Sequence, residues 1–292
     1  MEAPIRLSVI IPCYNASETI AMQLEAFANE SWTEPWELII ADNGSTDGTG
    51  DLIEQYRGRI EHLRVIDASG RRGQAHARNC GVQEARGDLL AFCDADDVIA
   101  PGWVAAMGRA LCVNDFVACR FDVDKLNAPW IRESRRNPQE QGVQAYTNPP
   151  FLEHAAAAGL GIRRSLHEAV GGFDESVPVL DDTDYCWRVQ LAGTELRFAP
   201  DAVIHYRYRS TLLGAYLQSK AYGMSNVLLY KKYRPLGMPD IRPNGAMKAW
   251  IKLVARFPSY MRTQAGRASW VRRLGWRVGR LQGCIKYRVF AP

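Results

Sequence analysis

Short apolar runs alternate with helical stretches in the N-terminal part of the chain, and this order constrains the fold more than any other feature. Turn-forming residues bound the runs, which have the length and β-branched content of buried strands. Such alternation predicts the α/β class, with a mostly parallel, Rossmann-like sheet and helices on both faces. The predicted strands are Leu7–Ile11, Leu38–Ala41, His62–Ile66 and Asp88–Cys93, and helices are expected over Ser17–Phe27, up to Tyr56, over Gly73–Ala85 and from Pro101.

The pattern is less regular further along the chain. Asp122–Pro150 is polar and proline-rich and has no periodicity, which predicts a long loop of the functional or mobile kind. Apolar order resumes over Ala155–Ile162. Helices are then expected over Asp181–Leu191 and Leu212–Tyr233, and the short strands Glu195–Phe198 and Ala202–His205 are expected between them.

Composition is that of a globular protein in a reducing compartment. The 292 residues can bury a sizeable core, and 47% of them are hydrophobic. The seven cysteines are odd in number and form no C-x-x-C pair, so they read as buried thiols. We find no secretory leader pattern and no apolar run of about 18 residues. These features predict a cytoplasmic protein.

Charge is divided unevenly along the chain. From Lys231 onward there are 15 of the 36 Lys and Arg residues and only one acid, Asp240, so this segment carries about +14 and the rest about −10. That asymmetry predicts two parts with different tasks.

Acidic residues follow the predicted strands at the point where each strand ends. Asp42 follows the second strand, and Asp94 and Asp96 follow the fourth, so all three should face one crevice. A carboxylate there can accept hydrogen bonds from a base or a ribose, and two carboxylates at i and i+2 can hold a hard divalent cation. Taken alone, Asp-x-Asp is more often a solvated turn.

Several motifs occur together in one order. They are Ser8-Val-Ile-Ile-Pro-Cys-Tyr-Asn15, Ala41-Asp-Asn-Gly-Ser-Thr-Asp-Gly48, Ala77-Arg-Asn79 with Gly81, Phe92-Cys-Asp-Ala-Asp-Asp97, Gly171-Gly-Phe-Asp-Glu175 and Asp181-Asp-x-Asp-x-x-x-Arg188. In this order and spacing the chain resembles, from about Leu7 to His205, the inverting, metal-dependent glycosyltransferases of family 2, which have the GT-A fold. The resemblance implies a GT-A catalytic domain over 1–210, with a donor half of about 1–121 and an acceptor half of about 145–210. A helical, basic C-terminal segment follows over 211–292.

The resemblance also implies a nucleotide-diphosphate sugar as donor and Mg²⁺ or Mn²⁺ as cofactor. The first motif lies where the family binds the nucleotide, Asp42 resembles the acid that reads the base, and Asp94 is expected toward the ribose. Asp96 is the implied metal ligand, and His205 is a second candidate, although a lone histidine is as often structural. The implied donor-binding residues are Pro12, Tyr14, Asn15, Asp42, Arg78, Asn79 and Asp94.

Inversion requires a carboxylate that deprotonates the acceptor hydroxyl. In the family's Glu-Asp pattern the second acid is this base, which corresponds to Asp182, and Asp181 stands here where Glu is usual. Asp184 and Arg188, at i and i+4 of the predicted helix, should form a scaffolding ion pair. For Asp182 the alternative is a simple helix-capping acid.

The basic tail shows a helical apolar stripe. Trp270, Leu274, Val278, Leu281, Ile285 and Val289 recur at spacings of three and four, with arginines off the stripe. This pattern is typical of a helix on an anionic membrane surface, and it is equally compatible with packing on the catalytic domain or a second subunit. Gly275, Gly279 and Gly283 would allow close approach of another helix. No nucleic-acid-binding fold is recognisable.

The function that these features favour is inverting glycosyl transfer to a lipid-linked glycan, a polysaccharide or a natural product. A sugar nucleotidyltransferase is a rival, but it would need a glycine-rich basic loop after the first strand. A non-catalytic nucleotide-sugar-binding or membrane-scaffold protein is the other alternative. The sequence leaves the oligomeric state open, with a homodimer among the options, and leaves peripheral membrane attachment open as well.

Overall fold

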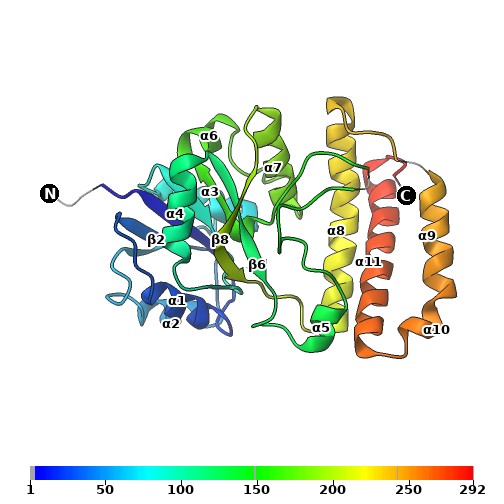
Figure 1. Cartoon of the computed structure of the whole chain (residues 1–292), viewed down its shortest axis with the longest axis horizontal. Helices are drawn as coiled ribbons and strands as arrows, with labels where there is room; N and C mark the ends of the chain where they lie inside the picture. Colours follow the sequence, from blue (N-terminus) through cyan, green and yellow to red (C-terminus); the bar gives the residue numbers. More distant parts are fainter. Residues whose placement is uncertain (1–3, 148, 242, 292) are drawn as a thin grey trace.

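The computed structural model describes residues 4–147, 149–241 and 243–291, and an eight-stranded sheet forms its centre (Figure 1). The strand order is β3-β2-β1-β4-β7-β6-β8-β5. Pairs within β3-β2-β1-β4 and the β6-β8 pair are parallel, whereas β7 and β5 run antiparallel to their neighbours. The predicted α/β class is confirmed. The strands are β1 Leu7–Cys13, β2 Trp36–Asp42, β3 Leu63–Asp67, β4 Leu89–Phe92, β5 Val98–Ile99, β6 Phe116–Asp122, β7 Leu160–Arg163 and β8 Arg197–His205.

Helices cover both faces of the sheet. Val9 and Ile11 of β1 belong to an apolar cluster with α1, α2 and α4, whereas Ile10 belongs to a second cluster with α3 and α7. This division follows from the alternation of side chains along a strand. The helices are α1 Ile20–Ala28, α2 Thr49–Glu54, α3 Gln74–Glu84, α4 Trp103–Val113, α5 Pro129–Glu133, α6 Arg164–Ala169, α7 Asp181–Leu191, α8 Leu212–Tyr233, α9 Pro243–Ala255, α10 Phe257–Tyr260 and α11 Gln264–Tyr287.

The structure corrects two predicted segments. The strands expected over 195–198 and 202–205 are one strand, β8, whose pairing with β6 shifts register between Cys119 and Arg120. Pro200 lies between the two paired stretches of β8, at a position that has no partner in β6. A proline is tolerated there because it has no N–H to donate to the neighbouring strand. The long loop expected over 122–150 contains a short helix, α5, with Pro129 at its first position.

The C-terminal helices stand beside the sheet, with α8, α11 and α9 side by side (Figure 1). Gly275, Gly279 and Gly283 of α11 lie directly against the backbone carbonyls of α8, which confirms the expected close helix approach. Tyr233 of α8 packs against Trp187 of α7 at 4.9 Å between ring centroids. The segment beyond residue 211 therefore shares an apolar cluster with α7.

We predict that Gly279→Ala destabilises the fold although alanine is the better helix former. A Cβ at this position would clash with the carbonyl oxygen of Lys220. Overpacking of this kind costs about 1–3 kcal/mol. The matched control is Gly245→Ala in α9, where a Cβ meets open space, so helix propensity alone should stabilise by up to about 1 kcal/mol. Chemical denaturation of both variants checks this, and an unchanged or higher midpoint for Gly279→Ala would contradict it.

Candidate active site

A cavity of about 740 Å³ opens at the carboxyl ends of β1 and β4. Ligands bind at this edge in open α/β sheets. Five of the sequence-predicted site residues line it, namely Pro12, Tyr14, Asn15, Asp94 and Asp96. The others, Asp42, Arg78, Asn79, Asp182 and His205, are not part of its lining.

Two turns at the cavity rim are held together by side chains after β1 and β2. Asn15 has a left-handed backbone, with φ +47°, and its Oδ1 accepts a hydrogen bond from the Thr46 amide at 2.8 Å. Asp42 accepts hydrogen bonds from the hydroxyl of Ser45 at 2.6 Å and from its amide. Tyr14 is half exposed, and Arg72 stacks over its ring and donates to its hydroxyl at 2.6 Å. The rim thus presents the ring of Tyr14 and the guanidinium group of Arg72 to the cavity.

Three aspartates converge after β4. Asp94, Asp96 and Asp97 each bring a carboxylate oxygen within 4.8 Å of the others. Burial and the charge of Asp94 raise the pKa of Asp96, and burial and the charges of Asp96 and Asp94 raise that of Asp97 well above its usual value.

The environment of this group fits a hard cation. Asp97 Oδ1 accepts from the Arg207 amide at 2.7 Å, whereas its buried Oδ2 has no hydrogen-bond partner in the described part of the chain. Buried carboxylate oxygens without partners are costly, and oxygen ligands are what Mg²⁺ and Mn²⁺ prefer.

His205 lies at the end of β8, outside this group of aspartates. Its Nδ1 is 2.6 Å from Asp122 Oδ2. Histidines that bind metals usually donate their other ring nitrogen to a carboxylate, so only Nε2 would be left for a metal. Metal ligation by His205 stays a prediction.

Arg78 is buried and holds two acidic segments together. It is 2% exposed, and its guanidinium donates to Asp94 at 2.8 Å and to Asp181 at 2.9 Å. The same guanidinium lies over the ring of Phe173. Its position orients Asp94, and contact of Arg78 with the diphosphate stays a prediction.

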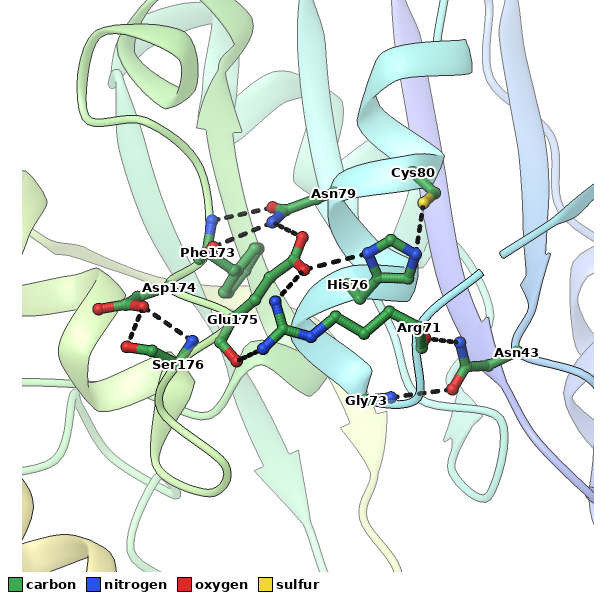
Figure 2. A network of polar contacts seen from close by, with 10 residues as sticks. All are labelled: Asn43, Arg71, Gly73, His76, Asn79, Cys80, Phe173, Asp174, Glu175 and Ser176. Atoms are coloured by element: carbon green, nitrogen blue, oxygen red, sulfur yellow. Dashed lines mark hydrogen bonds and ion pairs between the residues drawn. The ribbon is translucent and has the colours of Figure 1, made fainter. Parts of the chain in front are cut away.

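Asn79 belongs to a polar network beside the cavity (Figure 2). Its side chain pairs with the backbone of Phe173 at 2.9 Å in both directions and donates to Glu175 at 3.0 Å. Glu175 also contacts His76 and Arg71, each at 3.1 Å. Asn79 thus fixes the Gly171–Glu175 turn against α3, and direct donor contact by Asn79 stays a prediction.

Asp182 lies in the first turn of α7, after a strained residue. Leu180 has φ +66°, a conformation rare for leucine, and strain of this kind gathers at functional sites. Asp182 is half-buried and accepts hydrogen bonds from the amides of Thr183 at 2.7 Å and Ala157 at 3.4 Å. Burial, and then the charge of Asp181, raise its pKa to about 7. A carboxylate with such a pKa suits general base catalysis near neutral pH.

Asp184 is the structural acid of α7. Its side chain is fully buried, pairs with Arg188 at 2.8 Å as expected, and also contacts Lys232 at 2.6 Å and the Tyr233 hydroxyl at 2.8 Å. It therefore connects α7 to α8.

Comparison with known proteins identifies the family. The family model for Glycosyl transferase family 2 matches residues 8–171. This chain belongs to glycosyl transferase family 2.

Relatives of this family 2 chain include two curated bacterial and archaeal proteins. It is 31% identical over 174 residues to the uncharacterized glycosyltransferase YibD of Escherichia coli, covering 57% of this chain and 47% of YibD. It is 27% identical over 204 residues to the glycosyltransferase AglE of Haloferax volcanii, covering 68% of this chain and 65% of AglE. The alignments thus span about half to two thirds of these relatives.

A solved structure supports the GT-A fold. The mannosyltransferase PcManGT of Pyrobaculum calidifontis, in complex with GDP-Man and Mn²⁺, superposes with a TM-score of 0.66 at 18% identity, covering 97% of this chain and 90% of that one. At this identity the likeness concerns the fold.

Several residues that line the cavity of this family 2 chain were not predicted from its sequence, among them Asn43, Arg72 and Arg209. Arg72 and Arg209 line the cavity. Asn43 holds its wall by hydrogen bonds to the backbone of Ala68, Arg71 and Gly73, the last two of which Figure 2 shows. Asn43 stands within the Asp42–Gly48 motif, so its position was a usable signal. Arg72 and Arg209 lie outside all motifs, and only the fold brings them to the cavity.

Proposed function

We propose that this chain is an inverting glycosyltransferase that uses a nucleotide-diphosphate sugar and a divalent cation. The observation that carries the proposal is the convergence of three aspartates at the strand-end cavity. Of these, Asp94 and Asp96 line the cavity, and Asp97 is buried next to them, outside the cavity lining. The cavity has ample room for a nucleotide sugar, since ligand pockets typically measure about 300–1,000 Å³.

Asp96, with Asp94 and Asp97, would hold Mg²⁺ or Mn²⁺. When bound, the cation supplies charge neutralisation to the diphosphate leaving group. Tyr14, stacked with Arg72, offers a platform on which the nucleobase of the donor can stack. Arg209, whose guanidinium lies 3.6 Å from Asp96, offers a second positive charge near the diphosphate. The complex of PcManGT with GDP-Man and Mn²⁺ supports this choice of ligands by analogy of fold.

Asp182 is the proposed base. It takes the proton of the acceptor hydroxyl while that oxygen forms the new bond to the anomeric carbon. The bond from this carbon to the diphosphate oxygen breaks at the same time, and the nucleoside diphosphate leaves with the electron pair. Attack from the face opposite to the leaving group inverts the anomeric configuration.

The test is a donor screen followed by product analysis. Melting curves with Mn²⁺ and a panel of UDP-, GDP- and dTDP-sugars should show a rise with one nucleotide class, because a ligand stabilises by mass action. Incubation of that donor with acceptor mixtures should release nucleoside diphosphate and form a glycoside of inverted configuration. Donor binding without any turnover would favour the non-catalytic alternative, and formation of a nucleotide sugar from a triphosphate would favour the nucleotidyltransferase.

We further propose that the C-terminal helices meet an anionic membrane surface that carries the acceptor. No helix that the structure describes has an apolar stretch long enough to cross a bilayer. The outer face of α9 exposes Met247, Ile251 and Val254, each 61–70% exposed and spaced for one helix face. Of the stripe predicted on α11, Leu281 and Ile285 are also exposed, whereas Trp270 is half-buried and packs edge to face against Phe257.

We predict that Ile251→Glu combined with Val254→Glu releases the protein from anionic vesicles. Burial of one such side chain is worth about 1.5–3 kcal/mol, so the partition coefficient should fall at least about tenfold. The control is Val113→Glu, whose side chain is 81% exposed. It belongs to α4, which lies on the side of the molecule away from α9 (Figure 1). Vesicle sedimentation at two salt concentrations checks this. Equal binding of all three proteins, or no effect of salt, would contradict a membrane-facing α9.

A further inference from the structure

A second cavity, of about 540 Å³, lies between α8, α11 and the segment that follows α5. Figure 1 shows α5 at one end of the α8 and α11 pair. Five arginines line this cavity and no acidic residue does. They are Arg135, Arg136, Arg272, Arg273 and Arg277. We call it the arginine pocket.

The arginine pocket is an uncompensated concentration of positive charge. Within the described ranges, none of the five guanidinium groups forms an ion pair with a carboxylate, in contrast to Arg78 and Arg188 of the catalytic domain. Arg272 donates to the carbonyl of Ser134 at 3.2 Å, and Arg277 donates to that of Arg273 at 2.9 Å. These carbonyls satisfy single N–H groups but balance no charge.

Some of the donors in the pocket have no partner. The Nε atoms of Arg135 and Arg277 are buried and unpaired among the residues that the structure describes. Burial and the neighbouring charge of Arg135 lower the pKa of Arg272 to about 10, and burial and Arg273 lower that of Arg277. Buried donors and like charges are costly unless an anion occupies the space between them.

The pocket adjoins the proposed active site. Arg135 stacks on the ring of Tyr208 at 4.0 Å, and Tyr208 also lines the donor cavity. A small cleft lined by Arg135, Tyr208, Arg209 and Arg272 lies between the two. Burial, and then the charge of Asp182, raise the pKa of Tyr222, a pocket residue, to about 12.

We propose that the arginine pocket binds a phosphate or diphosphate group of the acceptor. A guanidinium group pairs with phosphate oxygens through two parallel hydrogen bonds. Several arginines without carboxylate partners therefore favour binding of a phosphate or diphosphate group. The pocket adjoins the donor cavity through Tyr208 but is lined by none of the three aspartates proposed to hold the donor's cation, which assigns it to the acceptor rather than to the donor. This assignment to the acceptor rests on the proposed glycosyltransferase function, whereas phosphate binding by the pocket does not.

The first arm of the test measures anion binding by the full chain without any need for activity. Inorganic pyrophosphate is titrated by calorimetry in EDTA, so that no metal at the aspartates can hold it. The variant Arg272→Gln with Arg277→Gln should weaken binding at least tenfold, and Arg136→Gln with Arg273→Gln, both exposed side chains, should weaken it as well. Arg267→Gln, an exposed arginine of α11 outside the pocket, is the control and should bind like the parent.

Melting curves separate this role from a structural one. Without pyrophosphate, replacing mutually repelling arginines should not lower the melting temperature. With pyrophosphate, the parent and the control should gain stability and the two double variants should not. Binding that is unaffected in both double variants, or no binding by the parent at millimolar pyrophosphate, would overturn the proposal.

The second arm distinguishes an acceptor group from a free anion. Farnesyl diphosphate in phosphatidylcholine vesicles, and pyrophosphate in solution, are tested as inhibitors of the transfer reaction defined above. Competition with the acceptor but not with the donor, lost in Arg136→Gln with Arg273→Gln, supports an acceptor subsite. Inhibition competitive with the donor in the parent would overturn the assignment to the acceptor. If the parent shows no transfer at all, the proposed function fails, and the calorimetric arm still decides whether the pocket binds the anion.

Discussion

Asp182→Asn should lower the rate of sugar transfer by about 10²–10⁴ at saturating donor, the usual worth of a general base. Asparagine keeps the shape of the side chain but cannot take the acceptor's proton. Donor affinity should barely change, because Asp182 does not line the donor cavity. Single-turnover transfer, measured beside a donor titration, checks both expectations. Near-parental transfer would place the base elsewhere, and a loss of donor binding would place Asp182 in the nucleotide site.

The pH profile and stability offer independent readouts for Asp182. Its pKa of about 7 means that the base is mostly protonated below neutrality, so kcat/KM of the parent should fall about tenfold per pH unit there. The pKa of Asp182 is raised in the folded state, so its ionisation destabilises the fold. This destabilisation is absent at low pH, where the carboxyl is protonated in both states, and is complete above pH 7. Asp182→Asn should therefore raise the melting temperature, and more at pH 8 than at pH 5.

Asp184→Asn is the matched control on the same helix. Asp184 is fully buried and contacts Arg188, Lys232 and Tyr233, so its loss removes the carboxylate partner of the half-buried Arg188 and one of the two partners of Lys232, which also pairs with Asp174. It should lower the melting temperature while sparing the rate of the molecules that remain folded. The opposite thermal shifts of two aspartates two residues apart would separate the base from the scaffold.

Asp96→Ala should weaken donor binding at least about 100-fold in the presence of Mn²⁺. Loss of a group that merely orients a metal ligand costs about 10–100-fold in metal affinity, and Asp96 is proposed as a ligand itself. EDTA should weaken donor binding by the parent to a similar extent, and Asp96→Ala should then add little. Calorimetry with the nucleoside diphosphate of the preferred donor measures both effects.

Asp88→Ala is the control for Asp96. Asp88 immediately precedes the same strand, β4, and its side chain is 79% exposed. It should bind donor and metal like the parent. Donor affinity that withstands both EDTA and Asp96→Ala would remove the cation from the proposed mechanism, and the charge of Arg209 would then be the leading candidate to stabilise the diphosphate.

Local patterns explain why much of the fold was predictable. Helices α7 and α8 have the predicted bounds, Asp181–Leu191 and Leu212–Tyr233, because their apolar periodicity and first-turn residues are local signals. The Asp184–Arg188 pair follows from i, i+4 geometry alone. Strand β8 was predicted in two pieces because Pro200 interrupts the local pattern, and only its pairing with β6 restores continuity across the irregular register.

The sequence by itself therefore determined the α/β class, the placement of Asp94 and Asp96 at a strand end, and the family. These depend on periodicity and on motifs that are continuous in the chain. Only the tertiary structure decided that Arg78 joins Asp94 to Asp181, that the glycines of α11 lie against α8, and that arginines from separate segments share one pocket. Such groupings depend on how helices pack against the sheet and against each other, and residues from separate segments of the chain carry no local signal of that contact.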